Sequence, residues 1–290
     1  MDNNEITQII LNTINNIIDN LLSSIDNNLY SLLDNLAFVD SNILNDNSFF
    51  NILGTSTTNG ILLISNSLLL GILIYYSVLY LLSHITYSQI ENPSSFIIKL
   101  ILCGICMNSS FFLLTYFINF ISFISSAILE IGENLHNTKI SFSELILNIN
   151  NNIAIDTSSL NFFSFDGILK TLISFSLLNL ILSYSFRYIL IKIFILITPF
   201  AILLNSLKST SWFFKSWFKT LFSLLFIQII ISLVLLVLFS INYSLNLFSK
   251  FIYIGGIYCL IKSNSLVKEF IGGISTDISQ NVYKLTNTLR

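Results

Sequence analysis

Residues 187–204 read RYILIKIFILITPFAILL and place two cations and a proline in an otherwise apolar run. The three exceptions are Arg187, Lys192 and Pro199. A cation deep in a bilayer costs about 2.5–3.5 kcal/mol on insertion scales, and a proline inside a helix costs about 3 kcal/mol. The position of these residues relative to the membrane therefore decides how the whole chain is threaded.

The composition around this run is that of an integral membrane protein. The 290 residues are 54% hydrophobic and only 10% charged, and the mean hydropathy is +0.80. A soluble protein typically has about 25% charged residues. Several apolar runs approach the roughly 20 residues that an α-helix needs to cross the hydrocarbon. We expect an all-α integral membrane protein, and a net charge of −2 argues against a strongly basic nucleic-acid domain.

The first 59 residues contain no Lys or Arg and are predicted to form an exported, amphipathic helical head. Between residues 6 and 36, apolar side chains recur three and four apart, which is helical spacing. The other face carries Asn together with Asp19, Asp26 and Asp34. Helices on a membrane surface usually carry Lys and Arg on the polar face. We therefore expect this head to pack on protein, either the chain's own membrane domain or a partner.

Residues 60–128 are predicted to hold the first two membrane spans, at about 61–82 and 96–118, with a continuation to 128 left open. Residues 129–166 are polar and acidic, and we expect them to form an external loop. Within this loop, residues 141–153 predict a short helix with Ser141 at its N-cap and Glu144 three residues later.

The positive-inside rule sets the orientation, because cytoplasmic loops carry an excess of Lys and Arg. The predicted 205–220 loop contains Lys208, Lys215 and Lys219 and no acid, and the 262–290 tail has four basic residues, so both are expected in the cytoplasm. The acidic head and the 129–166 loop are expected outside.

Residues 167–204 must then cross the membrane an odd number of times, so we expect one long crossing. With spans at about 221–241 and 247–261, residues 167–261 form a three-span core. The prediction is about five transmembrane helices in an N-out/C-in arrangement.

Arg187 lies about 20 residues after the start of this crossing, or roughly 30 Å along a helix. We therefore expect Arg187 and Lys192 to snorkel at the cytoplasmic interface. Residues 193–204 would continue beyond the bilayer with a kink near Pro199. An apolar helix outside the membrane needs protein to cover it, which predicts packing on the bundle or on a neighbouring subunit.

Two further features carry predicted roles. Trp212 and Trp217 alternate with Lys215 and Lys219, a pattern that favours lipid anchoring at the headgroup level or docking of a cytoplasmic ATPase. Gln228 lies inside the last strong span, where it either hydrogen-bonds a neighbouring helix or lines a pore. A nucleophile elbow, a P-loop and a dinucleotide-binding turn are all lacking from the sequence. We therefore expect no enzymatic activity, cofactor or metal site.

The segment from Arg187 to Gln228 resembles the TrbL family of conjugal transfer membrane proteins, which are polytopic inner-membrane channel subunits of type IV secretion systems. The matching features are Arg187 in a long apolar helix, Pro199, a polar stretch with Lys215 and Trp217, and Gln228 early in the next span. Residues 265–276, SLVKEFIGGIST, also resemble the family's C-terminal stretch.

This resemblance implies a multi-pass protein of a bacterial cytoplasmic membrane that assists the transfer of DNA or protein. The implied partners are other secretion components including cytoplasmic ATPases, further copies of the chain in a homo-oligomer, the lipid bilayer, and single-stranded DNA in transit. A small-solute transporter or channel is the alternative, although the predicted spans contain no acidic residue and show no convincing internal repeat.

Overall fold

The computed structural model describes residues 9–10, 13, 27–44, 47–54, 60–86, 92–152, 165–241 and 247–271. All regular secondary structure in these residues is helical, so the predicted all-α class is confirmed. The elements are α2 (Asn27–Ala37), the short 3-10 helix η1 (Ser41–Leu44), α3 (Asn47–Leu53), α4 (Ile61–Thr86), α5 (Pro93–Asn108), α6 (Ser110–His136), α7 (Phe142–Asn152), α8 (Phe165–Leu204), α9 (Ser211–Ser240) and α10 (Leu247–Ile271).

The described residues contain four helical segments long and apolar enough to cross a membrane, and the chain is a multi-pass membrane protein. These segments are Ile61–Ile85, Ser110–His136, Thr171–Leu204 and Ser211–Ser240. The predicted second span is divided, because α5 ends at Asn108 and α6 begins at Ser110. The predicted fifth span lies in α10, where Lys250, Lys262 and Lys268 shorten the apolar stretch.

Helix α8 is one continuous helix of 40 residues with Pro199 inside it, in agreement with the predicted single crossing. At 1.5 Å per residue it is about 60 Å long, roughly twice the thickness of the hydrocarbon core. The prediction of a 205–220 loop was too long, because α9 already begins at Ser211. The aromatic residues at 212–218 continue the apolar pattern on the N-terminal side of the predicted span, so the helix begins before that span.

The polar stretch at 129–166 is also more helical than expected, because α6 continues to His136. The predicted short helix within it is confirmed as α7. Its N-cap has the predicted hydrogen bond, in which the Glu144 backbone N–H donates to Ser141 Oγ at 3.1 Å.

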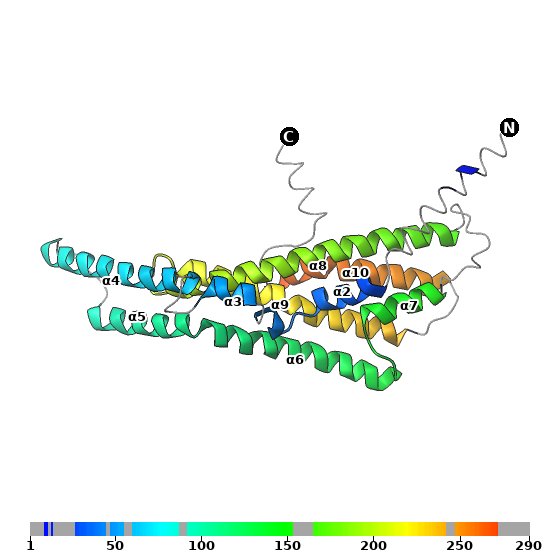
Figure 1. Cartoon of the computed structure of the whole chain (residues 1–290), viewed down its shortest axis with the longest axis horizontal. Helices are drawn as coiled ribbons and strands as arrows, with labels where there is room; N and C mark the ends of the chain where they lie inside the picture. Colours follow the sequence, from blue (N-terminus) through cyan, green and yellow to red (C-terminus); the bar gives the residue numbers. More distant parts are fainter. Residues whose placement is uncertain are drawn as a thin grey trace.

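Helix α9 lies at the centre of the bundle (Figure 1). It runs parallel to α6, since Ser125 pairs with Ser232 and Gly132 lies beside Leu236 farther along both helices. It runs antiparallel to α8, where Arg187 meets Leu224 and Phe194 meets Trp217. Helix α10 covers a further side of α9. Three helices therefore surround α9 over most of its length.

The hairpin of α4 and α5 extends past the turn between α8 and α9 (Figure 1). Tyr76 of α4 stacks on Phe96 of α5 with ring centroids 3.7 Å apart, and Leu207 in the α8–α9 turn packs beside this pair. Most other side chains of α4 point away from the rest of the protein.

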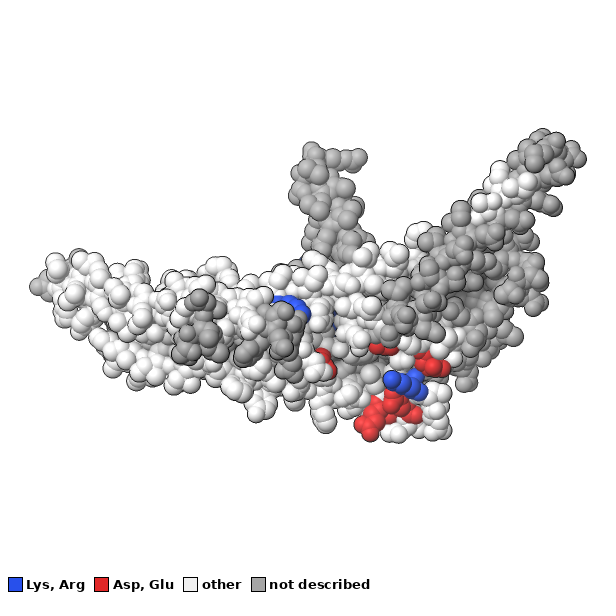
Figure 2. All heavy atoms as spheres, in the orientation of Figure 1, with Lys and Arg blue, Asp and Glu red and all other residues white. Residues whose placement is uncertain are grey.

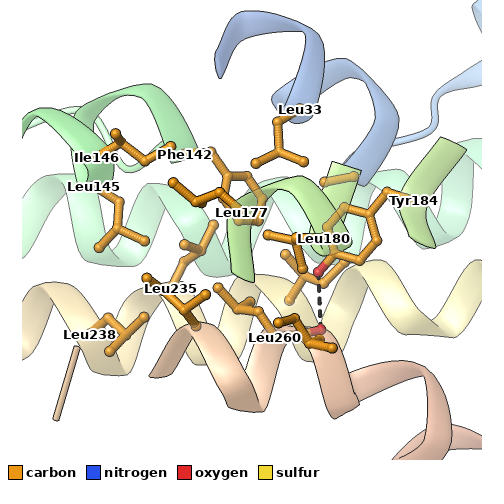
Figure 3. Packing of buried hydrophobic residues seen from close by; sticks show 14 of the residues in the cluster. Leu33, Phe142, Leu145, Ile146, Leu177, Leu180, Tyr184, Leu235, Leu238 and Leu260 are labelled. Atoms are coloured by element: carbon orange, nitrogen blue, oxygen red, sulfur yellow. Dashed lines mark hydrogen bonds between the residues drawn. The ribbon is translucent and has the colours of Figure 1, made fainter. Parts of the chain in front are cut away.

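Residues 27–44, here called the N-terminal arm, lie along the bundle and contact α7, α8 and α6. Leu33 of the arm packs in one apolar cluster with Phe142, Leu180 and Tyr184 (Figure 3). Asp34 accepts a hydrogen bond from the Phe142 backbone N–H at 2.8 Å, at the start of α7. The N-terminal arm of the amphipathic head thus packs on the chain's own membrane domain, whereas Ile9 and Ile10 are exposed. Asp19 and Asp26 lie outside the described residues.

Candidate functional site

Arg187 lies within α8 and is 0% exposed to solvent. The prediction that it snorkels at the membrane interface was therefore wrong. The reason is that the N-terminal arm folds over this part of α8 and supplies polar backbone groups at the depth of the guanidinium. A sequence-based estimate of depth counts residues along one helix and cannot include a segment from elsewhere in the chain.

The buried guanidinium is bound by backbone carbonyl groups. Arg187 Nε donates to the Leu224 carbonyl at 2.9 Å, and Nη1 donates to the Ala37 carbonyl at 3.1 Å. Ala37 is the last residue of α2, and the C-terminus of a helix carries a partial negative charge. Arg187 therefore caps α2, and the helix dipole supplies part of the countercharge that the cation needs.

Gln228 binds the same short segment of the arm. It is 0% exposed, and its Oε1 accepts a hydrogen bond from the Val39 backbone N–H at 3.0 Å. Gln228 follows Leu224 by four residues on α9, so both groups lie on the same face of that helix. Two of the residues predicted from the sequence thus meet at residues 37–39. The partner of Gln228 is the non-helical backbone at Val39, so this bond differs from the predicted one to a neighbouring helix.

Two donors of this buried centre lack a partner in the part of the chain that the structure describes. They are Arg187 Nη2 and Gln228 Nε2. A buried donor without an acceptor costs about 1–3 kcal/mol. Both groups are donors, and one belongs to a cation, so the centre is chemically suited to an electron-rich group such as a carbonyl, a carboxylate or another anion.

Further polar side chains join neighbouring helices around this centre. Ser125 of α6 and Ser232 of α9 share a hydrogen bond of 2.6 Å, and Asn264 Nδ2 of α10 donates to Ser183 Oγ of α8 at 2.8 Å. Tyr184 donates its hydroxyl proton to the Leu260 carbonyl at 3.3 Å (Figure 3). Such bonds between membrane helices each contribute about 0.6 kcal/mol on average. Ser125, Ser183 and Asn264 could not be singled out from the sequence, because Ser and Asn are abundant throughout the chain.

Lys192 and Pro199 lie farther along α8, away from the Arg187 centre. Lys192 Nζ lies 5.6 Å from the centre of the Phe49 ring in α3 and 5.3 Å from that of Tyr188. Pro199 is buried, and neighbouring Ile195 and Leu203 pack on α6, α9 and α5. Of the two predicted covers for residues 193–204, the bundle or a neighbouring subunit, the chain's own bundle supplies these contacts.

The predicted aromatic and basic stretch has two kinds of residue. Trp212 is 65% exposed, whereas Trp217 is 6% exposed and donates its indole N–H to the Phe194 carbonyl at 2.9 Å. Lys208, Lys215 and Lys219 are all exposed. Trp217 thus packs against α8 and does not belong to an exposed belt, while the other four residues remain available to lipid or protein.

Charged side chains are scarce on the described surface, and acidic ones gather where α6 ends and α7 begins (Figure 2). This end contains Glu130, Glu133 and Glu144, and the three lysines of the α8–α9 region lie at the opposite end of α9. Nearby, burial raises the pKa of Asp34 above its ordinary value, although the hydrogen bonds from Phe142 and Ser143 oppose this shift. The end where α6 meets α7 therefore has charges of both signs, since Lys139 and Lys250 also lie there, whereas the charges of the α8–α9 turn region are lysines.

The described residues include no group of three or more His, Cys, Asp or Glu side chains that could hold a metal ion. Comparisons with known protein families, with curated proteins and with solved structures found no match to this chain. The candidate site is therefore defined by its geometry alone: a buried arginine and glutamine that hold the N-terminal arm against α8 and α9.

Proposed function

We propose that this chain is a membrane subunit of a conjugative type IV secretion system in a bacterial cytoplasmic membrane. In this role it forms part of a channel or scaffold through which DNA or protein passes. Separate ATPases supply the energy, because the sequence contains no nucleotide-binding motif. The resemblance over residues 187–228 supports this proposal.

The observation that carries the proposal is the exposed apolar surface of the α4–α5 hairpin. Only 11% of the spanning window of α4 is buried within the chain, and the hairpin extends past the α8–α9 turn (Figure 1). A helix that is hydrophobic on all sides needs lipid or protein around it. A subunit of a large membrane assembly presents surfaces of this kind to its neighbours.

The distribution of charge supports an orientation with the N-terminus outside and the C-terminus in the cytoplasm. The acidic side chains where α6 meets α7 and the lysines around the α8–α9 turn lie at opposite ends of α9. By the positive-inside rule the lysines belong in the cytoplasm. Secretion ATPases would then meet the chain at Lys208, Lys215 and Lys219.

The test is purification of a tagged copy from its native host in mild detergent, with identification of the bound proteins by mass spectrometry. We expect a secretion ATPase, a DNA-coupling ATPase or other mating-channel proteins. A deletion strain should transfer its mobile element at least a hundredfold less often, and the intact gene should restore transfer. Normal transfer in the deletion strain, with none of these partners recovered, would exclude the proposal.

A second candidate function is transport of a small anionic solute. The favouring observation is the buried Arg187, whose Nη2 has no partner among the described residues. Ionisable residues within membrane spans often mark substrate pathways. Uptake of labelled carboxylates or phosphate into proteoliposomes, abolished in Arg187→Met, would favour this function over a role in conjugation.

A further inference from the structure

A hollow in the molecule lies between the last third of α8 and the first turns of α9. Its volume is ≈ 420 Å³, and the residues that shape it include Phe194, Ile197, Trp212, Phe213, Trp217 and Lys219. We call it the aromatic groove. Its wall is mostly apolar; the polar side chains that line it are the buried Thr220 and the exposed Lys219 and Ser216.

We propose that the aromatic groove binds an anionic phospholipid, with an acyl chain against the aromatic wall and the phosphate at Lys219. The groove lies between two membrane-spanning helices, and exposed Trp212 is at its edge, so lipid can reach it from the side. Its volume falls within the usual range of small-molecule pockets. This inference does not depend on the proposed role in conjugation.

The charge of the surrounding sequence favours an anionic lipid over a zwitterionic one. Residues 167–268 contain nine Lys and Arg residues and no Asp or Glu. Lys208 and Lys215 lie near Lys219 in the sequence and are exposed. The positive charge of the exposed Lys219 at the groove therefore favours an anionic headgroup.

The direction of side chains on α9 places the ammonium group of Lys219 near the depth of the lipid headgroups. Side chains of an α-helix point back toward its N-terminus, and α9 begins at the α8–α9 turn. Lys219 lies eight residues into α9, about 12 Å along it. Its long stem can therefore carry the ammonium group back toward the headgroup level. Phe194, which meets Trp217 and lies farther from the turn than Ile197, remains beside the acyl chain.

The chain has two tryptophans, Trp212 and Trp217, and both line the aromatic groove. Their fluorescence is therefore a direct probe of it. The full-length protein is reconstituted into vesicles that contain phosphatidylglycerol or phosphatidylcholine with brominated acyl chains, which quench tryptophan on contact. We expect half-maximal quenching at about fivefold less phosphatidylglycerol than phosphatidylcholine, since one lysine near an anionic lipid contributes roughly 1 kcal/mol.

Lys215 offers a matched control, because it is exposed, lies one turn before Lys219 on α9 and is not among the residues that line the groove. Lys219→Gln should abolish the preference for phosphatidylglycerol, and Lys215→Gln should keep it. Ser216→Phe, which fills the groove, should weaken quenching by phosphatidylglycerol. Size-exclusion chromatography of each variant checks that it is folded.

Several results would overturn the proposal. Equal quenching of the wild type by the two lipids would show an unselective lipid shell, and identical effects of Lys219→Gln and Lys215→Gln would show a diffuse charge effect. Unchanged quenching in Ser216→Phe would place the lipid outside the groove. Weak quenching by both lipids would indicate that the groove is covered by protein.

Discussion

Helices α4 and α9 are both apolar and both long enough to cross a membrane, but their surroundings are opposite. In the 18-residue apolar stretch of α9, 61% is buried within the chain. In the corresponding stretch of α4, 11% is buried. Their hydropathies, 3.0 and 2.0, are both well above what a span requires. Hydropathy therefore identifies helices that belong in a membrane, but it does not distinguish the centre of a bundle from its periphery.

The difference comes from small and polar residues placed at contacts. Gly132 and Gly256 lie directly against Leu236 and Leu238 of α9, whereas Gly71 of α4 has open space around it. Small residues allow membrane helices to approach closely, and polar ones join them by hydrogen bonds. Around α9 both devices recur along the helix, whereas the contacts of α4 with α5 include one close approach, of Gly104 to Leu69, and the polar pair of Asn66 with Asn108.

The sharpest test of this comparison is removal of the cation that holds the arm against α8 and α9. Arg187→Met leaves the Ala37 carbonyl without its charged donor, a loss of about 1.5–3 kcal/mol. The detached state of the arm should become roughly ten- to a hundredfold more populated. Limited proteolysis in detergent should therefore cut residues 37–44 faster by a similar factor.

Phe186→Met is the control for this variant, because Phe186 is the preceding residue and points outward. It should leave proteolysis of the arm unchanged. If Arg187→Met protects the arm as well as the wild type does, then the apolar contacts of Leu33 hold the arm without help from the buried centre.

The second test replaces glycine with a larger residue in both regions, at the contact of α10 with α9 and in α4. A side chain at Gly256 would overlap Leu238, whereas one at neighbouring Gly255 or at Gly71 meets nothing within 4 Å. Overpacking typically costs 1–3 kcal/mol. Gly256→Val should therefore lower the melting temperature in detergent by several degrees, while Gly255→Val and Gly71→Val should change it little. Equal losses in all three would mean that the close contact of Gly256 with Leu238 does not set the difference between the two regions.

A third test compares polar groups in the two regions. Gln228→Leu leaves the Val39 N–H without its acceptor, and we expect a loss of about 1 kcal/mol in the free energy of unfolding. Asn66→Leu breaks the exposed Asn66–Asn108 pair and should cost about half as much or less. Thermal unfolding in one detergent measures both. A larger loss for Asn66→Leu would show that the α4–α5 hairpin is stabilised more than its exposure suggests.

The smallest effect concerns pH and the arm. Since burial raises the pKa of Asp34 in the folded chain, the folded state binds more protons than the unfolded state between the ordinary pKa and the raised one. Stability should therefore increase slightly as the pH falls through this window toward the ordinary pKa. Asp34→Asn should remove this part of the pH dependence in melting curves between pH 4 and 7. An unchanged slope would assign the effect to other groups.

The sequence predicted the helical class, the membrane location, the single long helix at α8 and the capped helix α7. These depend on composition, on periodicity or on neighbours a few residues apart, such as Ser141 and Glu144. The sequence also singled out Arg187 and Gln228, because charged and amide groups are rare in apolar runs. Their shared partner could not be predicted, since the Ala37 and Val39 backbone groups lie 150 and 189 residues away.

The boundaries of the spans were predicted less well. Four helical segments of the described residues meet the criteria for spans where about five were expected, because lysines shorten the apolar stretch of α10. The second span is shifted to α6, because the interruption at Asn108 and Ser109 looks no different in sequence from other polar pairs in apolar runs. The burial of Trp217 was also missed, since its acceptor, the Phe194 carbonyl, is a backbone group without a sequence signature. Backbone partners of this kind appear only when the helices are placed in space.

The anchoring of the arm also has a consequence for the order in which the protein is made. Residues 37–39 leave the ribosome early, whereas Arg187 and Gln228, which bind them, are synthesised 150 and 189 residues later. At about 5–20 residues per second, this interval lasts on the order of ten seconds or more. The nascent arm must remain near the membrane during that time. The Ala37 carbonyl of the arm must then be in place when Arg187 enters the membrane.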